Sequence, residues 1–437
     1  MNVQIISANF DKPDANKLAV YEKLGGYRSL EKVFKMKPEE VVEHVKKSGL
    51  RGRGGAGFSA GMKWSFVPKN IDKPKYLCVN ADEGEPGTFK DRKILQLDPH
   101  RMIEGIITCS YAVGIHTAYI YIRGEYTRPR LSTQAAIDEA YAKGYLGKDI
   151  MGSGFDLDVV VHRGAGAYIC GEETGLIESL EGKKGQPRAK PPYPAVIGVF
   201  GCPTVVNNVE TLSALPFIMN GGWEAYAKLG TEKSTGTMLF SISGSVKRPG
   251  VYEGEFGVNL WDFIEECTGG VKGGRRLKAV IPGGSSSSIL TAEEARNTGL
   301  DYESIAAAGS MVGSGAIMVL GEDDCVVKAL QVVSRFYAHE SCGQCPQCRE
   351  GTYFISQLAD RIENGRGNDE DVEKILSTCP MMLGVTVCVL ADSIAMPARS
   401  YIEKFRHEFD EHITQKRCPY NPATVPAAAR AGGGELA

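Results

Sequence analysis

The stretch that decides the fold is Gly52-Arg53-Gly54-Gly55-Ala56-Gly57-Phe58, which continues as Ser59-Ala60-Gly61-Met62-Lys63-Trp64. Four glycines within six residues leave the backbone without side-chain bulk, so its N–H groups can turn toward an anion. An arginine, a lysine and two aromatic rings belong to the same stretch. It therefore predicts a phosphate cradle beside a surface on which a ring can stack.

The residues before this loop predict a short helix over 38–47. Pro38 opens it, acids occupy its first turn, lysines its last turn, and Gly49 follows. The glycine loop thus follows a helix, whereas the dinucleotide fingerprint G-x-G-x-x-G opens one. No lysine followed by Ser or Thr makes a Walker loop here. Judged alone, the stretch would fit a flexible surface turn as well as a cofactor site.

Composition limits the class of protein. The 437 residues suffice for two or three domains, and a net charge of -3 gives no nucleic-acid footprint. The longest apolar runs, 310–320 and 381–391, are too short to cross a bilayer, and no signal or transit peptide is recognisable. We expect a soluble, cytoplasmic protein. Its twelve cysteines are then expected to be metal ligands and buried thiols, not a disulfide framework.

Strand and helix patterns alternate after the glycine loop. Strands are predicted at 76–80, 118–122 and 155–161, and helices at 99–113 and 130–145. This alternation favours an α/β fold with a mostly parallel sheet covered by helices. Ligands gather at the carboxyl ends of such strands, where the acidic stretch 80–85 falls. A solvated turn is the alternative for those acids.

A second glycine-rich loop, 164–175, runs into a helix and could bind an anion at the helix N-terminus. Glu172 and Glu173 suit acceptors for hydroxyls or amides better than phosphate ligands, although acids in a first turn also simply complement the helix dipole. A stiff segment, 188–194, follows with two cations and a ring, and Asn207-Asn208 is interpreted as a turn.

Three cysteines near the C-terminus supply an independent signal. Cys342, Cys345 and Cys348 stand at two-residue intervals in a turn between apolar helices, a spacing that lets three thiolates bind one iron–sulfur cubane. Zinc is the main competitor, although a second C-x-x-C pair or histidines would then be expected. For the fourth ligand, Cys379 in a Cys-Pro pair and Cys388 both remain open.

The region 236–320 has a different pattern, with predicted strands at 237–243 and 279–282, a turn at 248–252 and a helix at 260–267. It predicts a small α+β insert. Helical periods then dominate, at 324–338, 349–363, 369–378 and 391–407. Four antiparallel helices would bury their apolar faces together and carry the cysteine turn at one end.

Taken together, these motifs resemble the flavoprotein, or NADH-binding, subunit of respiratory complex I. Close relatives of that family are the flavin-containing diaphorase subunits of NAD-linked hydrogenases and formate dehydrogenases. The resemblance covers roughly residues 20 to 410. It implies four parts: a Rossmann-like FMN- and NADH-binding domain at 1–228, a ubiquitin-like domain at 229–322, a helical bundle with a [4Fe-4S] cluster at 323–418, and a disordered tail at 419–437.

The resemblance also assigns residues. FMN would be held by Gly52, Arg53, Gly54, Lys63, Asn80, Asp82, Asn207, Asn208 and Thr211, with Glu83 and Gly171 close by. NADH would contact Phe58, Phe66, Glu85, Glu172, Glu173, Lys190 and Tyr193. The cluster ligands would be Cys342, Cys345, Cys348 and Cys388, because the family has a glycine four residues before the fourth ligand. Buried thiols would then be Cys379, Cys78, Cys109, Cys202, Cys267 and Cys325.

The implied function is that of an NADH dehydrogenase flavoprotein. It would take a hydride onto FMN, pass electrons singly to the cluster and then to a small thioredoxin-like [2Fe-2S] subunit and larger iron–sulfur subunits, and so feed quinone reduction. No catalytic acid or base is needed. The protein would be peripheral to the inner membrane, held there by the rest of the complex without direct insertion. The alternatives are a diaphorase subunit of a soluble hydrogenase or formate dehydrogenase, and a zinc-stabilised nucleotide-binding scaffold without redox activity.

Overall fold

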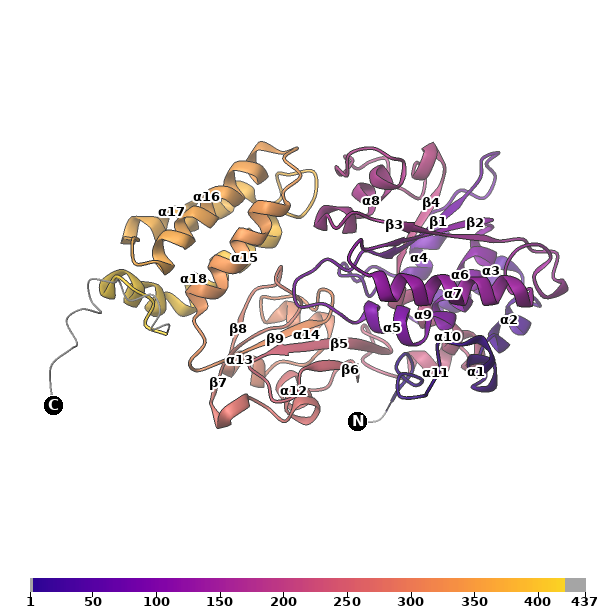
Figure 1. The fold of residues 1–437 in the computed structure, drawn as a ribbon, viewed down its shortest axis with the longest axis horizontal. Coiled ribbons are helices and arrows are strands. Elements are labelled where there is room, and N and C mark those ends of the chain that lie inside the picture. Colours follow the sequence, from indigo (N-terminus) through magenta and orange to yellow (C-terminus); the bar gives the residue numbers. More distant parts are fainter. Residues whose placement is uncertain (1–2, 421–437) are drawn as a thin grey trace.

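A four-stranded parallel sheet organises the N-terminal half of the protein in the computed structural model, which describes residues 3–420 (Figure 1). Its strand order is β3-β2-β1-β4. The strands are β1 (Tyr76–Ala81), β2 (Thr117–Ile122), β3 (Asp158–Arg163) and β4 (Thr204–Asn208). The first three confirm the predicted strands. β4 corrects the interpretation of Asn207-Asn208 as a turn, because both asparagines end a strand that pairs with β1.

Apolar residues cover both faces of this sheet, as expected for parallel strands. Leu77 and Val79 pack on one face in the cluster that includes residues of α6, whereas Cys78 belongs to the cluster that includes Leu176 and Ile177 of α8 on the other face. The helices of this half are α1 (Leu18–Lys23), α2 (Arg28–Val33), α3 (Pro38–Lys47), α4 (Ala60–Ser65), α5 (Asp91–Leu97), α6 (Pro99–Val113), α7 (Thr127–Lys143), α8 (Glu173–Leu180), α9 (Val209–Ser213), α10 (Leu215–Gly221) and α11 (Trp223–Ala227). The parallel α/β architecture predicted from the sequence is confirmed.

A second, mixed sheet follows, with strand order β6-β5-β9-β7-β8. Its strands are β5 (Thr237–Gly244), β6 (Gly250–Glu255), β7 (Leu277–Ile281), β8 (Leu290–Thr291) and β9 (Ala316–Gly321), with helices α12 (Leu260–Thr268), α13 (Ala292–Arg296) and α14 (Tyr302–Ala307). The predicted turn at 248–252 is wrong in its second half, because β6 begins at Gly250 and pairs with β5. The small α+β unit itself is confirmed.

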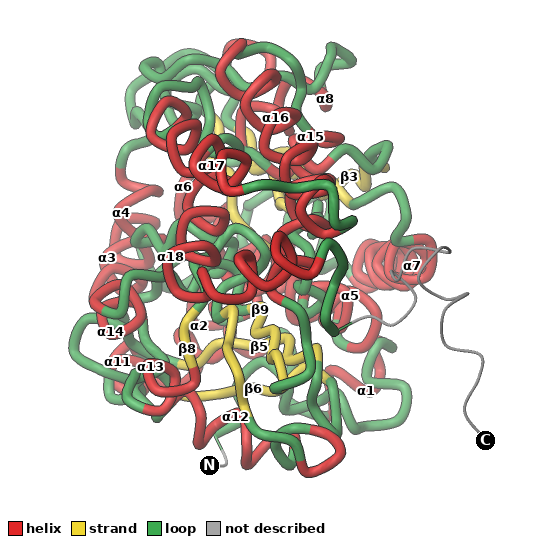
Figure 2. The backbone as a smooth tube through the Cα atoms, turned by 90° about the vertical axis from the view of Figure 1, so that its left-hand side faces the viewer, coloured by secondary structure: helices red, strands yellow, loops and turns green. Residues whose placement is uncertain are grey.

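Four helices form the C-terminal part: α15 (Val326–Glu340), α16 (Pro346–Glu363), α17 (Asp369–Met382) and α18 (Asp392–Gln415). Figure 1 shows them packed side by side at one end of the molecule, with the second sheet below them. Figure 2, turned by 90°, shows the same bundle in front of the sheets. The predicted bundle is confirmed, although α17 continues past Pro380 and α18 extends to Gln415.

One apolar cluster continues from the first sheet into the bundle, since it includes Cys78, Leu176, Ile281, Leu330 and Ile355. Of the predicted disordered tail, Pro419 and Tyr420 lie in a described turn, and residues 421–437 lie outside the described residues. Within residues 3–420, no helix is long and apolar enough to cross a membrane.

Candidate functional site

The glycine-rich loop closes on itself between α3 and α4. The Gly52 N–H donates to the Phe58 carbonyl at 2.8 Å, and the Ala60 N–H donates to the Leu50 carbonyl at 2.9 Å. The loop lies against the end of β4 and the start of α9, because the Arg53 N–H donates to Thr211 Oγ1 at 2.9 Å. A Cβ added to Gly54 would lie 3.1 Å from the Asn208 Cβ. The structure thus brings together the predicted residues Gly52, Gly54, Asn208 and Thr211.

The side chain of Arg53 points into the core and is 1% exposed. Its guanidinium donates to the carbonyls of Arg51, Thr235 and Thr237 and to the Tyr226 hydroxyl. These acceptors use its donors, so the side chain anchors the loop, and the backbone of Arg53 is the part that could face a phosphate.

The carboxyl end of β1 carries an acceptor that lacks a partner among residues 3–420. The Asn80 amide donates to the Gly171 carbonyl at 2.8 Å, which fixes the second glycine loop beside β1. Asp82 Oδ2 is buried and accepts no hydrogen bond there. Burial raises the pKa of Asp82 to about 7. A buried, unsatisfied acceptor is costly unless a ligand donates to it. The hydroxyls and ring N–H of a flavin fit this need.

Glu83 has a different environment. Its carboxylate accepts from the N–H groups of Asp91 and Arg92 at 2.8 and 3.0 Å and from the Tyr126 hydroxyl at 2.7 Å. Burial raises its pKa to about 7. The side chain therefore satisfies the N-terminus of α5, a position that complements the helix dipole, and does not face the loop opening.

The sequence analysis missed a buried ion network beneath the glycine loop. Lys90 Nζ lies 2.6 Å from Glu210 Oε2 and 2.9 Å from Asp91 Oδ1. Asp91 Oδ2 accepts from the Asn208 amide at 2.6 Å, so the network orients a predicted flavin residue. All three charged side chains are buried. No local pattern indicates this network, because Glu210 is remote in sequence from Lys90 and Asp91.

Two lysines and two glutamates meet where the two glycine loops approach. Lys63 Nζ lies 3.2 Å from Glu173, and Lys190 Nζ lies 2.9 Å from Glu172 and 2.7 Å from Glu173. Burial opposes the ionisation of Glu173, but Lys63 and Lys190 outweigh it and lower its pKa. Predicted flavin and NADH residues therefore form one charged cluster.

The two glutamates differ in their other contacts. Glu172 is the N-cap of α8, and its carboxylate accepts from the N–H groups of Thr174 and Gly175 at 2.8 and 2.9 Å. Glu173 contacts the lysines alone among the hydrogen bonds of its side chain in residues 3–420. Glu172 is thus committed to the helix, and Glu173 is the acid whose partners a ligand could replace.

Three large aromatic rings around these loops are open to solvent. Phe58, Phe66 and Tyr193 are 48%, 52% and 58% exposed. The Phe58 and Phe66 ring centroids lie 6.1 Å apart. Exposed rings beside a polar cluster provide a surface on which a purine can stack.

Glu85 joins all three parts of the protein. It accepts from the Tyr168 hydroxyl at 2.6 Å, the Ser286 N–H at 2.8 Å, the Ser285 hydroxyl at 3.2 Å and the Tyr337 hydroxyl at 3.4 Å. Its carboxylate is therefore already supplied with donors, and holding the parts together is the role that these contacts support.

The cysteine turn lies between α15 and α16, with Cys348 in the first turn of α16. The Val387 N–H donates to Cys345 Sγ at 3.4 Å, which brings the loop of Cys388 to this turn. Burial, with the proximity of Cys348, raises the pKa of Cys388 to about 12. Cys379 lies instead inside α17, fully buried in the apolar core. The structure thus brings four thiols together, a donor set that fits an iron–sulfur cubane.

Comparison with known proteins identifies the family. Three family models match: the Nuo51 FMN-binding domain at residues 45–216, the SLBB domain at 238–319, and the NADH-ubiquinone oxidoreductase-F iron-sulfur binding region at 328–412. The second of the F subunits of NADH-quinone oxidoreductase in Rhizobium meliloti is 50% identical over 418 residues, which cover 95% of this chain and 99% of the relative. The chain belongs to the family of NADH-quinone oxidoreductase F subunits.

Other relatives agree. The NADH-quinone oxidoreductase F subunit of Mycobacterium tuberculosis is 48% identical over 425 residues, with 96% of this chain and 95% of the relative covered. Among solved structures, a chain of an NAD+-reducing [NiFe]-hydrogenase in the air-oxidised state matches with a TM-score of 0.81 and 35% identity, over 98% of this chain and 69% of that chain. The H2-reduced state matches equally well, with a TM-score of 0.81 and 34% identity.

Membership of this family confirms the resemblance found in the motifs, and with it an oxidoreductase flavoprotein subunit with FMN and a [4Fe-4S] cluster as cofactors. It argues against the redox-inactive scaffold. The hydrogenase likeness supports the diaphorase alternative only weakly, because identity to the quinone oxidoreductase subunits is higher.

Proposed function

We propose that this chain oxidises NADH at an FMN held between the two glycine loops and delivers the electrons to a [4Fe-4S] cluster at the cysteine turn. The bound flavin accepts two electrons as a hydride and releases them singly, which a one-electron cluster requires. The observation that carries the proposal is the contact between the two sites. The Gln186 amide, in the segment after α8, donates to the Cys342 carbonyl at 3.2 Å, and the Tyr168 N–H donates to Glu340 at 2.9 Å.

The flavin contacts divide by chemistry. The backbone of the first loop suits the phosphate, and the unsatisfied Asp82 carboxylate suits a flavin donor. We assign FMN binding to Gly52, Arg53, Gly54, Lys63, Asn80, Asp82, Gly171, Asn207, Asn208 and Thr211, with Arg53 acting through its backbone. Glu83 supports the site through α5.

The nucleotide would lie on the solvent side of the same loops. Phe58, Phe66 and Tyr193 offer rings for the adenine, and Glu173 with Lys190 offers an acceptor and a donor for ribose and phosphate groups. Glu172 acts as the cap of α8, and Glu85 as the link between parts. These residues orient NADH and need not move a proton.

Family membership implies partner subunits. We propose that the next acceptor is a small thioredoxin-like [2Fe-2S] subunit followed by larger iron–sulfur subunits. We also propose that the chain works on the cytoplasmic side of the inner membrane, held there by the rest of the complex. The support is the name of the relatives, which are subunits of a quinone reductase. The likeness to an NAD+-reducing hydrogenase favours a diaphorase subunit as the second candidate.

The division of labour also rests on separate domains, for which we propose the bounds 1–228, 229–322 and 323–418. The test is Cys348→Ser, with the half-buried Cys267→Ser as a matched thiol control. After anaerobic purification, Cys348→Ser should lose the cluster's iron and sulfide, keep FMN, and still show bleaching of the flavin by NADH. The control should keep both cofactors. Loss of FMN from a folded Cys348→Ser protein would overturn the division.

A further inference from the structure

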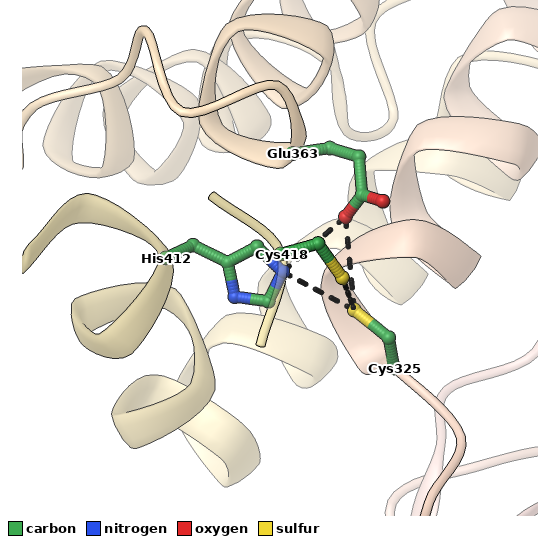
Figure 3. A group of neighbouring side chains, drawn as sticks. All are labelled: Cys325, Glu363, His412 and Cys418. Carbon is green, nitrogen blue, oxygen red and sulfur yellow. Dashed lines mark hydrogen bonds and ion pairs between the residues drawn. The ribbon is translucent and has the colours of Figure 1, made fainter. Parts of the chain in front are cut away.

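A second group of metal-binding side chains lies at the other end of the bundle. Cys325, Glu363, His412 and Cys418 place their ligand atoms within 4.8 Å of one another (Figure 3). Cys325 precedes α15, Glu363 ends α16, His412 lies near the end of α18, and Cys418 follows α18. The sequence analysis interpreted Cys325 as a buried thiol and assigned nothing to the others.

The separations match the edges of a tetrahedron around one ion. Cys325 Sγ lies 3.7 Å from Cys418 Sγ, 3.3 Å from His412 Nε2 and 3.7 Å from Glu363 Oε2, and His412 Nε2 lies 3.3 Å from Glu363 Oε2. Zinc bonds of about 2.3 Å to sulfur and about 2.0–2.1 Å to nitrogen and oxygen would separate tetrahedral ligands by about 3.8 Å for two sulfurs and about 3.4–3.6 Å for the other pairs.

The histidine is oriented for metal binding. His412 Nδ1 lies 2.6 Å from the Glu408 carbonyl oxygen, which can only accept, so Nδ1 carries the proton. The unprotonated Nε2 of the neutral ring then faces Cys325 and Glu363. A ligand histidine whose second nitrogen donates to a carbonyl is the usual arrangement around protein-bound metals.

Burial makes the group costly without an ion. His412 and Glu363 are 0% and 1% exposed, and Glu363 Oε1 accepts no hydrogen bond among residues 3–420. A cation would compensate the buried carboxylate. The Lys328 N–H donates to Cys325 Sγ at 3.2 Å, at the positive end of α15, a contact that favours a thiolate there.

We propose that Cys325, Glu363, His412 and Cys418 bind one structural Zn2+ ion. Two thiolates and one imidazole select zinc over harder cations, and burial of the ligands leaves no open position for substrate. Binding releases the two thiol protons to solvent. The ion would fasten the segment after α18 to the facing ends of α15 and α16. It is a site separate from the four cysteines of the iron–sulfur turn.

The direct test is metal analysis of the full-length chain, purified anaerobically and passed over a chelating resin. We expect about one zinc per chain in addition to the cluster iron. Zinc X-ray absorption should show two sulfur ligands at about 2.3 Å and two nitrogen or oxygen ligands at about 2.0 Å. Less than about a tenth of an equivalent of zinc, iron in place of zinc, or a Cys325–Cys418 disulfide under these conditions would each overturn the proposal.

Matched variants locate the ion. His412→Gln and Cys418→Ser should each lower zinc at least fivefold while cluster iron and FMN stay. His407→Gln, on the same helix but exposed, and Cys267→Ser should keep zinc. In the variants that lose zinc, amide exchange should quicken at residues 412–420. Zinc retained at wild-type level in both ligand variants would show that the ion is bound elsewhere.

Discussion

Lys90→Met is expected to destabilise the flavin domain strongly. Methionine keeps the apolar length of the lysine stem but removes the charge that Asp91 and Glu210 share. Lys90 and Glu210 are each 1% exposed, so water cannot replace the ammonium group. Removing one partner from such a buried group leaves uncompensated charge and costs about 3–5 kcal/mol. At about 2–4 °C per kcal/mol, the melting temperature should fall by roughly 10 °C.

The loss should depend on pH, and its sign follows from linkage. Burial already raises the pKa of Glu210, and Lys90 opposes that rise. Without Lys90 the folded pKa moves further above the unfolded value of about 4. A raised folded pKa means that the folded variant holds a proton that the unfolded chain has released. Stability is therefore lost as pH rises above about 4, and the deficit against wild type should grow from pH 5 to pH 8.

The assay is thermal release of FMN, followed by flavin fluorescence at pH 5, 6, 7 and 8. Lys93→Met on the same helix is the control and should change stability by no more than about 0.5 kcal/mol. A deficit below about 1 kcal/mol, or one that is the same at all four pH values, would refute the reasoning.

Three further predictions concern the sites directly. Cys388→Ala should abolish the low-temperature paramagnetic signal of the reduced [4Fe-4S] cluster and Cys379→Ala should keep it, whereas the opposite result would make the Cys-Pro cysteine the ligand. Glu173→Gln should improve NADPH oxidation with ferricyanide by about tenfold through reduced repulsion of the 2′-phosphate, whereas Glu172→Gln should mainly lower stability by about 1 kcal/mol; equal selectivity changes would contradict this assignment. In flavin-free protein, Asp82→Asn should become more stable than wild type as pH rises from 4 to 7, by up to about 3 kcal/mol in a thermal melt series, because the raised pKa of about 7 makes ionisation of the folded carboxyl unfavourable; a difference that does not change with pH would show that Asp82 finds a partner.

Periodicity predicted most of the fold because most elements carry their own signal. The strands at β1 and β2 and the helix at α6 were found within one residue of their observed ends. Two strands lacked such a signal. β4 has only three residues before its two asparagines, and Pro249-Gly250 looks like a turn although β6 begins there. Both strands form because a neighbouring strand offers hydrogen-bond partners, which a single segment does not reveal.

The sites were predictable where ligands are close in sequence. The glycine loops and the cysteine turn are local motifs, and the structure places them as a group. The direction of a side chain was not predictable. Arg53 and Glu83 belong to the expected stretches, yet their side chains serve the core and a helix end. Lys90 with Glu210, and Cys325 with Cys418, are remote in sequence, so only the folded chain brings them together.

The two metal sites occupy opposite ends of the same helix pair. α15 begins beside Cys325 and ends beside Cys342, and α16 runs back from Cys345 to Glu363. At 1.5 Å per residue, the 15 residues of α15 span roughly 22 Å, so a tilt of about 5° at one end moves the other by about 2 Å. The Tyr168 N–H contact with Glu340 fixes the cluster end against the flavin loop. A zinc ion at the far end would therefore hold the distance that each electron crosses, although zinc itself carries none.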